Sequence, residues 1–189
     1  MKIKPYILSL LAIISLLYAC TSKEDRYKKK VQEYYDAYYQ KRDMNSVKSL
    51  FSAGVQYYDD KYKMPADTFA LIFDFDKKLQ AKTQIVSMAV NKDTVTVIEK
   101  LTDELDPLLK RPSAQYKKKF VLKEGKIFEI VSFPYKPEEW ANKYVESMQK
   151  FFMWVREANP KEFPILTSEP YTHADLILTN AKEYAKQVK

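Results

Sequence analysis

The spacing of apolar side chains begins with a helical period. Over residues 24–41 the apolar positions recur on one face of a helix, at Tyr27, Val31, Tyr34, Tyr35, Tyr38 and Tyr39. A shorter helix with Val47, Leu50 and Phe51 should follow, capped by Asp43 or Asn45 and ended by Gly54 in a left-handed turn. Residues 55–58 then predict a short strand.

A third helix is predicted from Pro65, which suits the first position of a helix, and its apolar stripe is formed by Ala66, Phe69, Ile72, Phe73 and Leu79. The period then changes to two. Residues 83–90 and 94–101 predict a hairpin that turns at residues 91–93. Residues 115–122 and 127–133 predict a second hairpin, in which Gly125 can take a positive φ.

The helical period returns at residue 137. Its apolar stripe consists of Trp140, Tyr144, Met148, Phe151, Phe152 and Val155, and it stops before Asn159 and Pro160. A proline-containing loop is expected next. Thr172 and Asp175 have the spacing of a capping box, so the last helix should start there and include Leu176, Ala181 and Tyr184.

This order of elements over residues 27–134 resembles that of the NTF2-like cone, also called the SnoaL-like or cystatin-like fold. The resemblance implies an α+β fold in which N-terminal helices pack on a curved antiparallel sheet and enclose a pocket. Residues 136–189 would be a helical extension packed on this domain of residues 27–135. A generic α+β sandwich is the alternative, because strand order cannot be derived from the pattern.

The first residues have the character of an export signal. Lys2 and Lys4 precede an apolar run of about a dozen residues, which is shorter than the ~20 needed to span a bilayer. The segment Leu17-Tyr18-Ala19-Cys20 resembles the lipobox of bacterial lipoproteins. The resemblance implies removal of residues 1–19, acylation of Cys20 and a membrane anchor of two or three acyl chains, followed by a tether over residues 20–26.

The residues after Cys20 bear on localisation in the cell envelope. Thr21, in place of an aspartate, resembles the enterobacterial pattern for the outer membrane. Residues 22–25, Ser-Lys-Glu-Asp, resemble the acidic signal that directs some lipoproteins of the Bacteroidota to the cell surface. An ordinary solvated tether has the same composition, so both the periplasmic face and the cell surface stay open.

Composition excludes several classes of site. The chain has 189 residues, of which 46% are hydrophobic, enough for one sizeable core. Only two glycines occur, so a Gly-rich phosphate loop cannot be built. One cysteine and one histidine exclude multi-His zinc sites and internal disulfides. No cofactor is implied.

Two glutamates interrupt apolar rows of the predicted sheet. Glu99 alternates with Val95, Val97 and Leu101, and Glu129 should share a face with Lys118 in the second hairpin. A carboxylate in apolar surroundings has a raised pKa and can act as a general acid or base. Alternatively, the face is solvated or Lys118 neutralises Glu129, and a register shift of one residue would invert the faces.

Other chemistry-bearing residues favour structural roles. Asp74 and Asp76 diverge on a helix, so surface positions are expected rather than a metal site. His173 lies beside a predicted helix start without a visible catalytic partner. The 15 tyrosines could stack on aromatic ligands or sugars, but at helical spacing they are more typical of a core.

The charge balance is moderately basic. The formal charge is +7, and loss of Lys2 and Lys4 with the signal would leave +5. The lysines at 28–30 and 117–119 could contact anionic headgroups near the anchor or simply solvate a helix and an edge strand. Nucleic-acid binding is disfavoured, because no recognition motif is present.

These patterns predict a lipid-anchored envelope protein with a non-enzymatic module that binds a small apolar ligand or an envelope protein. A lyase or isomerase that uses Glu99 or Glu129 in the cone is the alternative. A structural lipoprotein with a filled cone is the third possibility.

Overall fold

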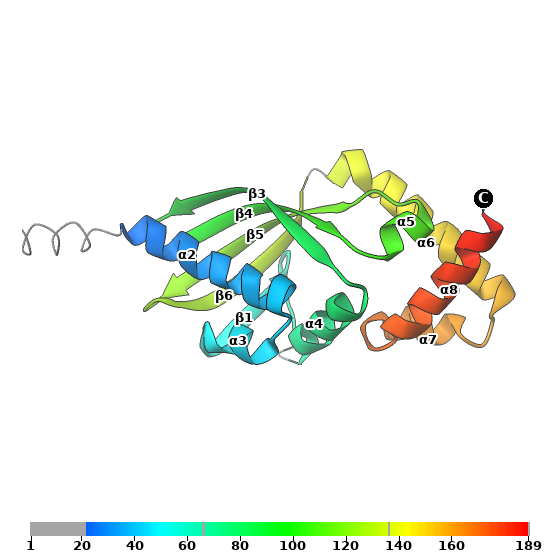
Figure 1. Ribbon diagram of the computed structural model, residues 1–189, viewed down its shortest axis with the longest axis horizontal. Coiled ribbons are helices and arrows are strands. Elements are labelled where there is room, and N and C mark those ends of the chain that lie inside the picture. The colour runs from blue at the N-terminus through cyan, green and yellow to red at the C-terminus, as the bar shows by residue number, and fades with distance from the viewer. Residues whose placement is uncertain (1–21, 66, 136, 189) are drawn as a thin grey trace, which may run out of the picture.

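The computed structural model describes residues 22–65, 67–135 and 137–188, and all of their side chains except those of residues 137–140. Residues 1–19 and Cys20, on which the predicted signal and anchor depend, lie outside the described residues. Figure 1 shows a curved sheet with helices along one face and a group of C-terminal helices at one end.

The N-terminal half alternates helices with the first strands. The elements are α2 (Lys23–Tyr35), the π-helix η1 (Asp36–Lys41), α3 (Met44–Ser49), β1 (Phe51–Asp59), β2 (Tyr62–Lys63) and α4 (Thr68–Lys78). Ser22 caps α2 by accepting a hydrogen bond from the backbone N–H of Asp25, so residues 22–26 are the cap and first turn of a helix instead of the expected tether. Asp43 caps α3, as predicted.

Two long hairpins complete the sheet. They are β3 (Lys82–Asn91) with β4 (Thr94–Thr102), and β5 (Ala114–Lys123) with β6 (Lys126–Pro134), joined by the short helix α5 (Leu105–Leu109). The strand order is β2-β1-β6-β5-β4-β3. β1 runs parallel to β6, and the remaining pairs are antiparallel.

Gly54 has a different role from the one expected. It lies inside β1 with φ +73°, where the pairing with β6 shifts register between Phe51 and Gln56. The predicted helix stop is therefore wrong, because the positive φ serves a bulge in a strand. Gly125 confirms its prediction with φ +74° in the β5–β6 turn.

The main core lies between α2 and the sheet. Val31, Tyr34 and Tyr35 are buried on one face of α2, and the ring of Phe120 on β5 packs against Tyr34 at 5.1 Å between centroids. Val95 and Val97 on β4 are also fully buried. The apolar face that the alternation of residues predicts for β4 is thus the face that packs against α2.

A second core joins the C-terminal helices to the end of the sheet. The helices are α6 (Pro137–Ala158), α7 (Phe163–Ser168), the 3₁₀ turn η2 (Pro170–Thr172) and α8 (Ala174–Gln187). Their buried residues are Phe151, Val155, Leu166, Ile177, Ala181 and Tyr184, which pack with Leu79, Leu105 and Leu109. The extension after residue 136 is therefore fixed to the α4 and α5 end of the cone (Figure 1).

Candidate ligand-binding cavity

A cavity of about 520 Å³ lies where the cone meets the C-terminal helices. This volume is in the range of small-molecule sites. From the cone, its walls include Tyr34, Tyr38, Tyr39, Tyr57, Phe69, Asp76, Tyr116, Lys118, Ile130 and Ser132. From the extension, they include Tyr144, Met148, Phe152, Leu166, Tyr171 and Ile177. Most of the wall is aromatic or aliphatic, with a few polar groups among it.

The π-helical turn places consecutive tyrosines in this wall. Tyr38 and Tyr39 are both buried in η1 and both line the cavity. Their ring centroids are 4.5 Å apart. Arg42 caps the C-terminus of η1 with a φ of 53°, and its guanidinium donates to the backbone oxygens of Lys77 and Ala81. The wide turn is thereby held against the end of α4.

Asp76 is the carboxylate at the cavity surface. It lies on α4, is partly buried, and accepts a hydrogen bond of 2.8 Å from the hydroxyl of Tyr38. Burial raises the pKa of Asp76 to about 6, although the Tyr38 hydrogen bond and Lys118 act in the opposite direction. Burial also raises the pKa of Tyr38 well above its usual value, so this hydroxyl remains a donor at neutral pH.

Lys118 is the cation of the same wall, and it pairs with a glutamate behind it. Its Nζ lies 2.8 Å from Oε1 of Glu99, whose side chain is fully buried. Thr83 donates a hydrogen bond to the other oxygen at 3.4 Å. Glu99 is not among the residues that line the cavity. The pair therefore presents its lysine to the cavity and its carboxylate to the core.

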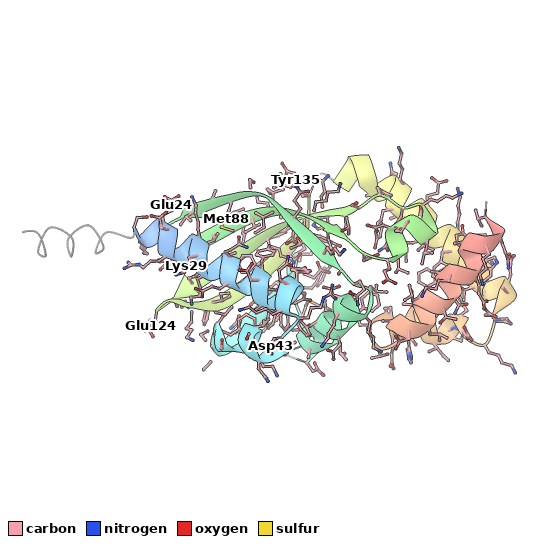
Figure 2. The ribbon with its side chains drawn as sticks, in the orientation of Figure 1. Glu24, Lys29, Asp43, Met88, Glu124 and Tyr135 are labelled. Atoms are coloured by element: carbon pink, nitrogen blue, oxygen red, sulfur yellow. The ribbon has the colours of Figure 1, made fainter. Side chains whose placement is uncertain are left out.

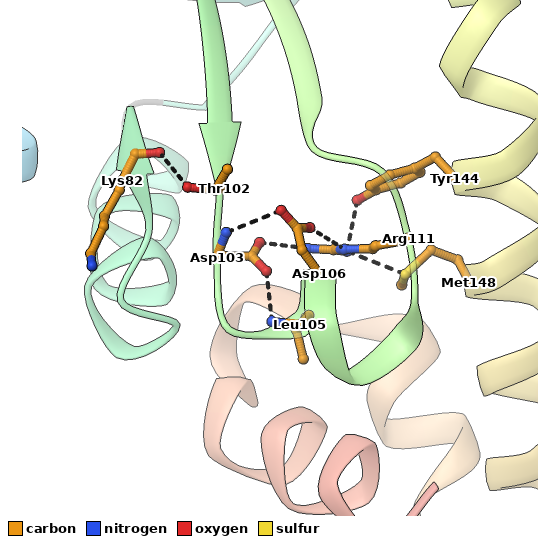
Figure 3. Close-up of polar contacts among 8 residues, drawn as sticks. All are labelled: Lys82, Thr102, Asp103, Leu105, Asp106, Arg111, Tyr144 and Met148. Atoms are coloured by element: carbon orange, nitrogen blue, oxygen red, sulfur yellow. Dashed lines mark hydrogen bonds and ion pairs between the residues drawn. The ribbon is translucent and has the colours of Figure 1, made fainter. Parts of the chain in front are cut away.

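Arg111 joins the cone to the extension (Figure 3). Its guanidinium contacts Asp106 at 2.8 Å and Asp103 at 2.5 Å, both on the connection between β4 and β5. It also donates to the hydroxyl of Tyr144 on α6 at 3.0 Å. Arg111 is buried, and Arg111, Asp103 and Tyr144 all line the cavity. The cluster thus fixes one edge of the cavity.

The structure separates the two glutamates that the sequence analysis grouped. The predicted face of β4 is confirmed, because Glu99 is buried beside Val95 and Val97. Glu129 pairs in register with Val121, whereas Lys118 pairs with Ser132. The expected shared face of Lys118 and Glu129 is wrong, because a register shift between Val121 and Leu122 moves Glu129 to the opposite face.

The expected surface position is confirmed for Asp74, which is exposed, and wrong for Asp76. The helical period carried the missing signal, since Phe69, Phe73 and Asp76 follow at intervals of four and three. His173 is partly exposed before α8 and does not line the cavity. The contact of Tyr38 with Asp76 and that of Arg111 with Tyr144 had no such signal, since each joins residues more than 30 positions apart.

A separate apolar groove of about 380 Å³ runs along the extension. It is lined by residues of α6 and by Phe163 and Thr167 of α7, and Val145 and Met153 are exposed there. Such a strip on α6 is the feature expected of a protein-binding surface. Tyr144, Met148 and Phe152 contribute to both the groove and the cavity.

In the described part of the chain, no helix is long and apolar enough to cross a membrane. Within the same residues, no group of three or more His, Cys, Asp or Glu side chains could hold a metal ion.

Comparisons with known proteins show likeness of fold. No family model and no curated protein sequence matches the chain. Among solved structures, Bal32a from a soil-derived mobile gene cassette has a TM-score of 0.51 at 16% identity, covering 65% of this chain and 99% of that one.

Two further structures are similar at lower scores. An NTF2-like protein of unknown function from Cytophaga hutchinsonii has a TM-score of 0.46 at 11% identity, covering 62% of this chain and 96% of its own. A protein assigned as a SnoaL-like polyketide cyclase from a Jannaschia species has a TM-score of 0.49 at 16% identity. The match covers 60% of this chain and 88% of that one. The predicted α+β fold, with N-terminal helices on a curved sheet and a C-terminal helical extension, is confirmed.

Proposed function

We propose that this protein is a lipid-anchored protein of the bacterial cell envelope, acylated at Cys20, whose cone binds a small and largely apolar ligand. The cavity of about 520 Å³ at the junction of cone and extension is the observation that carries the ligand-binding role. The anchor is supported by the charged start, apolar run and lipobox-like segment of residues 1–20. The outer membrane, at its periplasmic face or at the cell surface, is the proposed location.

The walls indicate what kind of ligand would fit. Aromatic rings from η1, β1 and α4 offer flat apolar surface, as in the parallel rings of Tyr57 and Phe69 at 4.2 Å between centroids. Lys118, which is paired with Glu99, supplies a cationic donor at the cavity wall, and Asp76 with Tyr38 supplies a polar pair. A flat apolar molecule with one anionic or hydrogen-bonding group matches this arrangement.

The placement of Glu99 and Glu129 does not favour the lyase or isomerase alternative. Glu99 is paired with Lys118 behind the wall, and Glu129 lies on the opposite face of the sheet. A general acid or base must reach the proton that it transfers. The binding role needs no such group, and the groove along α6 keeps an envelope protein as a second proposed partner.

Two neighbouring residues of β6 provide a test. Ser132 lines the cavity, whereas Val131 is not among its lining residues and pairs with Lys119 on the other face. We expect 1-anilinonaphthalene-8-sulfonate, an apolar fluorophore with one anionic group, to bind with a rise in fluorescence. Ser132→Phe should abolish the saturable part of this signal by filling the cavity, and Val131→Phe should retain it. Equal signals from both variants would contradict binding in the cavity.

A further inference from the structure

The end of the molecule that carries the start of α2 is rich in cations. α2 begins there, and the β3–β4 and β5–β6 turns lie at the same end, opposite the C-terminal helices (Figure 1). Lys23 pairs with Asp93 of the β3–β4 turn at 2.7 Å, and Tyr27 donates to the same carboxylate at 3.1 Å. Figure 2 shows Glu24, Lys29 and Glu124 at this end. The helix and both turns therefore form one surface.

This surface contains a groove of about 460 Å³ between α2 and the β5–β6 turn. Its cationic lining residues are Lys23, Arg26, Lys29 and Lys30, and its acidic ones are Glu33 and Glu124. Lys23 and Lys30 are paired, with Asp93 and Glu33. Arg26 and Lys29 are exposed and form no ion pair among the described residues. They are available to bind an anionic group.

The position of Cys20 determines what this surface faces. Cys20 is joined to Ser22 through Thr21 alone, and two residues of chain span at most about 7 Å. If Cys20 carries acyl chains in a bilayer, the first turns of α2 lie at the level of the headgroups. This step rests on the proposed anchor.

We propose that the surface formed by Lys23, Arg26, Lys29 and Lys30 docks on anionic phospholipid headgroups beside the acyl anchor. Phosphodiester groups fit the groove, because Arg26 and Lys29 can donate to their oxygens without breaking an ion pair. Docking at this end directs the C-terminal helices and the adjoining cavity away from the bilayer (Figure 1). The surface adds electrostatic attraction to an anchor whose two or three acyl chains already suffice for stable attachment.

Vesicle binding tests the surface independently of the anchor. The chain from Ser22 onward retains both cores, whose buried residues all lie between Val31 and Tyr184. This chain should sediment with phosphatidylcholine vesicles that contain phosphatidylglycerol, should be released by salt, and should not bind phosphatidylcholine alone. Arg26→Ala with Lys29→Ala should weaken binding about 25-fold, since each cation near the surface contributes about fivefold.

Lys182→Ala with Lys186→Ala is the matched control, because both lysines are exposed on α8 at the opposite end. This variant should bind like the parent chain. Equal binding to neutral and anionic vesicles, or equal losses in the two double variants, would overturn the proposal. Because the chain tested lacks Cys20, absence of acylation cannot produce either result, and the mass of the exported protein measures acylation separately.

Discussion

Asp74 and Asp76 show how two positions on one helix acquire different chemistry. Both belong to α4, yet Asp74 is exposed whereas Asp76 faces Tyr38 at the cavity. The pKa of Asp76 is raised to about 6 by burial, against an ordinary value of 3.8. The folded protein therefore binds more protons than the unfolded chain between these two pH values.

This shift makes the stability contribution of Asp76 depend on pH. The contribution is full below pH 3.8, falls as pH rises, and is lost above about pH 6. Asp76→Asn keeps an acceptor for Tyr38 and removes the charge. At pH 7 we expect this variant to be more stable by about 1–2 kcal/mol, with the difference vanishing near pH 4, after allowance for partial solvent access. Urea unfolding at both pH values measures this, and an equal difference at both would contradict it.

The glutamates show how far a single residue can be predicted from the sequence. Alternation with Val95 and Val97 correctly places Glu99 on the buried face of β4. The same reasoning fails for Glu129, because the extra residue in the β6 pairing does not appear in the pattern of apolar positions. Lys118, the partner expected for Glu129, instead neutralises Glu99 diagonally across the β4–β5 pair, where Lys118 is in register with Val97.

At the scale of elements, the long periodic segments were predicted and the short connections were missed. Both hairpins and the helices α2, α3, α4 and α6 lie close to the expected ranges. α4 starts at Thr68 rather than at Pro65, and α5 and α7 were not expected. The predicted capping box is also wrong, since Thr172 lies in η2 and α8 begins at Ala174. α5 and α7 have too few positions to establish a period, and neither has a side-chain cap such as the one that Asp43 provides for α3.

One of these short elements carries the polar connection between cone and extension. Arg111 is buried after α5 and binds Asp103, Asp106 and Tyr144, which are partly buried. Arg111→Met should destabilise the protein by about 2–4 kcal/mol, because it leaves two partly buried carboxylates without their cation. Lys150→Met removes the exposed pair with Glu146 and should cost less than about 1 kcal/mol. Chemical denaturation measures the free energy of unfolding of both variants. Equal decreases would contradict a larger stabilisation by the Arg111 cluster than by an exposed ion pair.

At the scale of the whole molecule, the cone and the extension both contribute walls to one cavity. The resemblance to the cone predicted a pocket, and the apolar stripe of residues 140–155 predicted a packed helix. The two parts share one cavity because of the position that α6 takes after β6 and because of the contacts of Arg111. Neither is encoded in a local pattern, so the composition of the cavity could not be derived from the sequence.

The arrangement of the whole molecule at the membrane depends on Cys20. If it is acylated, the mature protein should start at residue 20, and its intact mass should include two or three acyl chains. Each buried methylene contributes about 0.8 kcal/mol, so the protein should require detergent for extraction.

Cys20→Ser should remove the acyl mass and leave only salt-sensitive attachment through Arg26 and Lys29. Thr21→Ala is the control that keeps the thiol. An unmodified Cys20 in the exported protein would contradict the anchor, and salt-resistant attachment of the Cys20→Ser variant would show that another part of the chain holds the membrane.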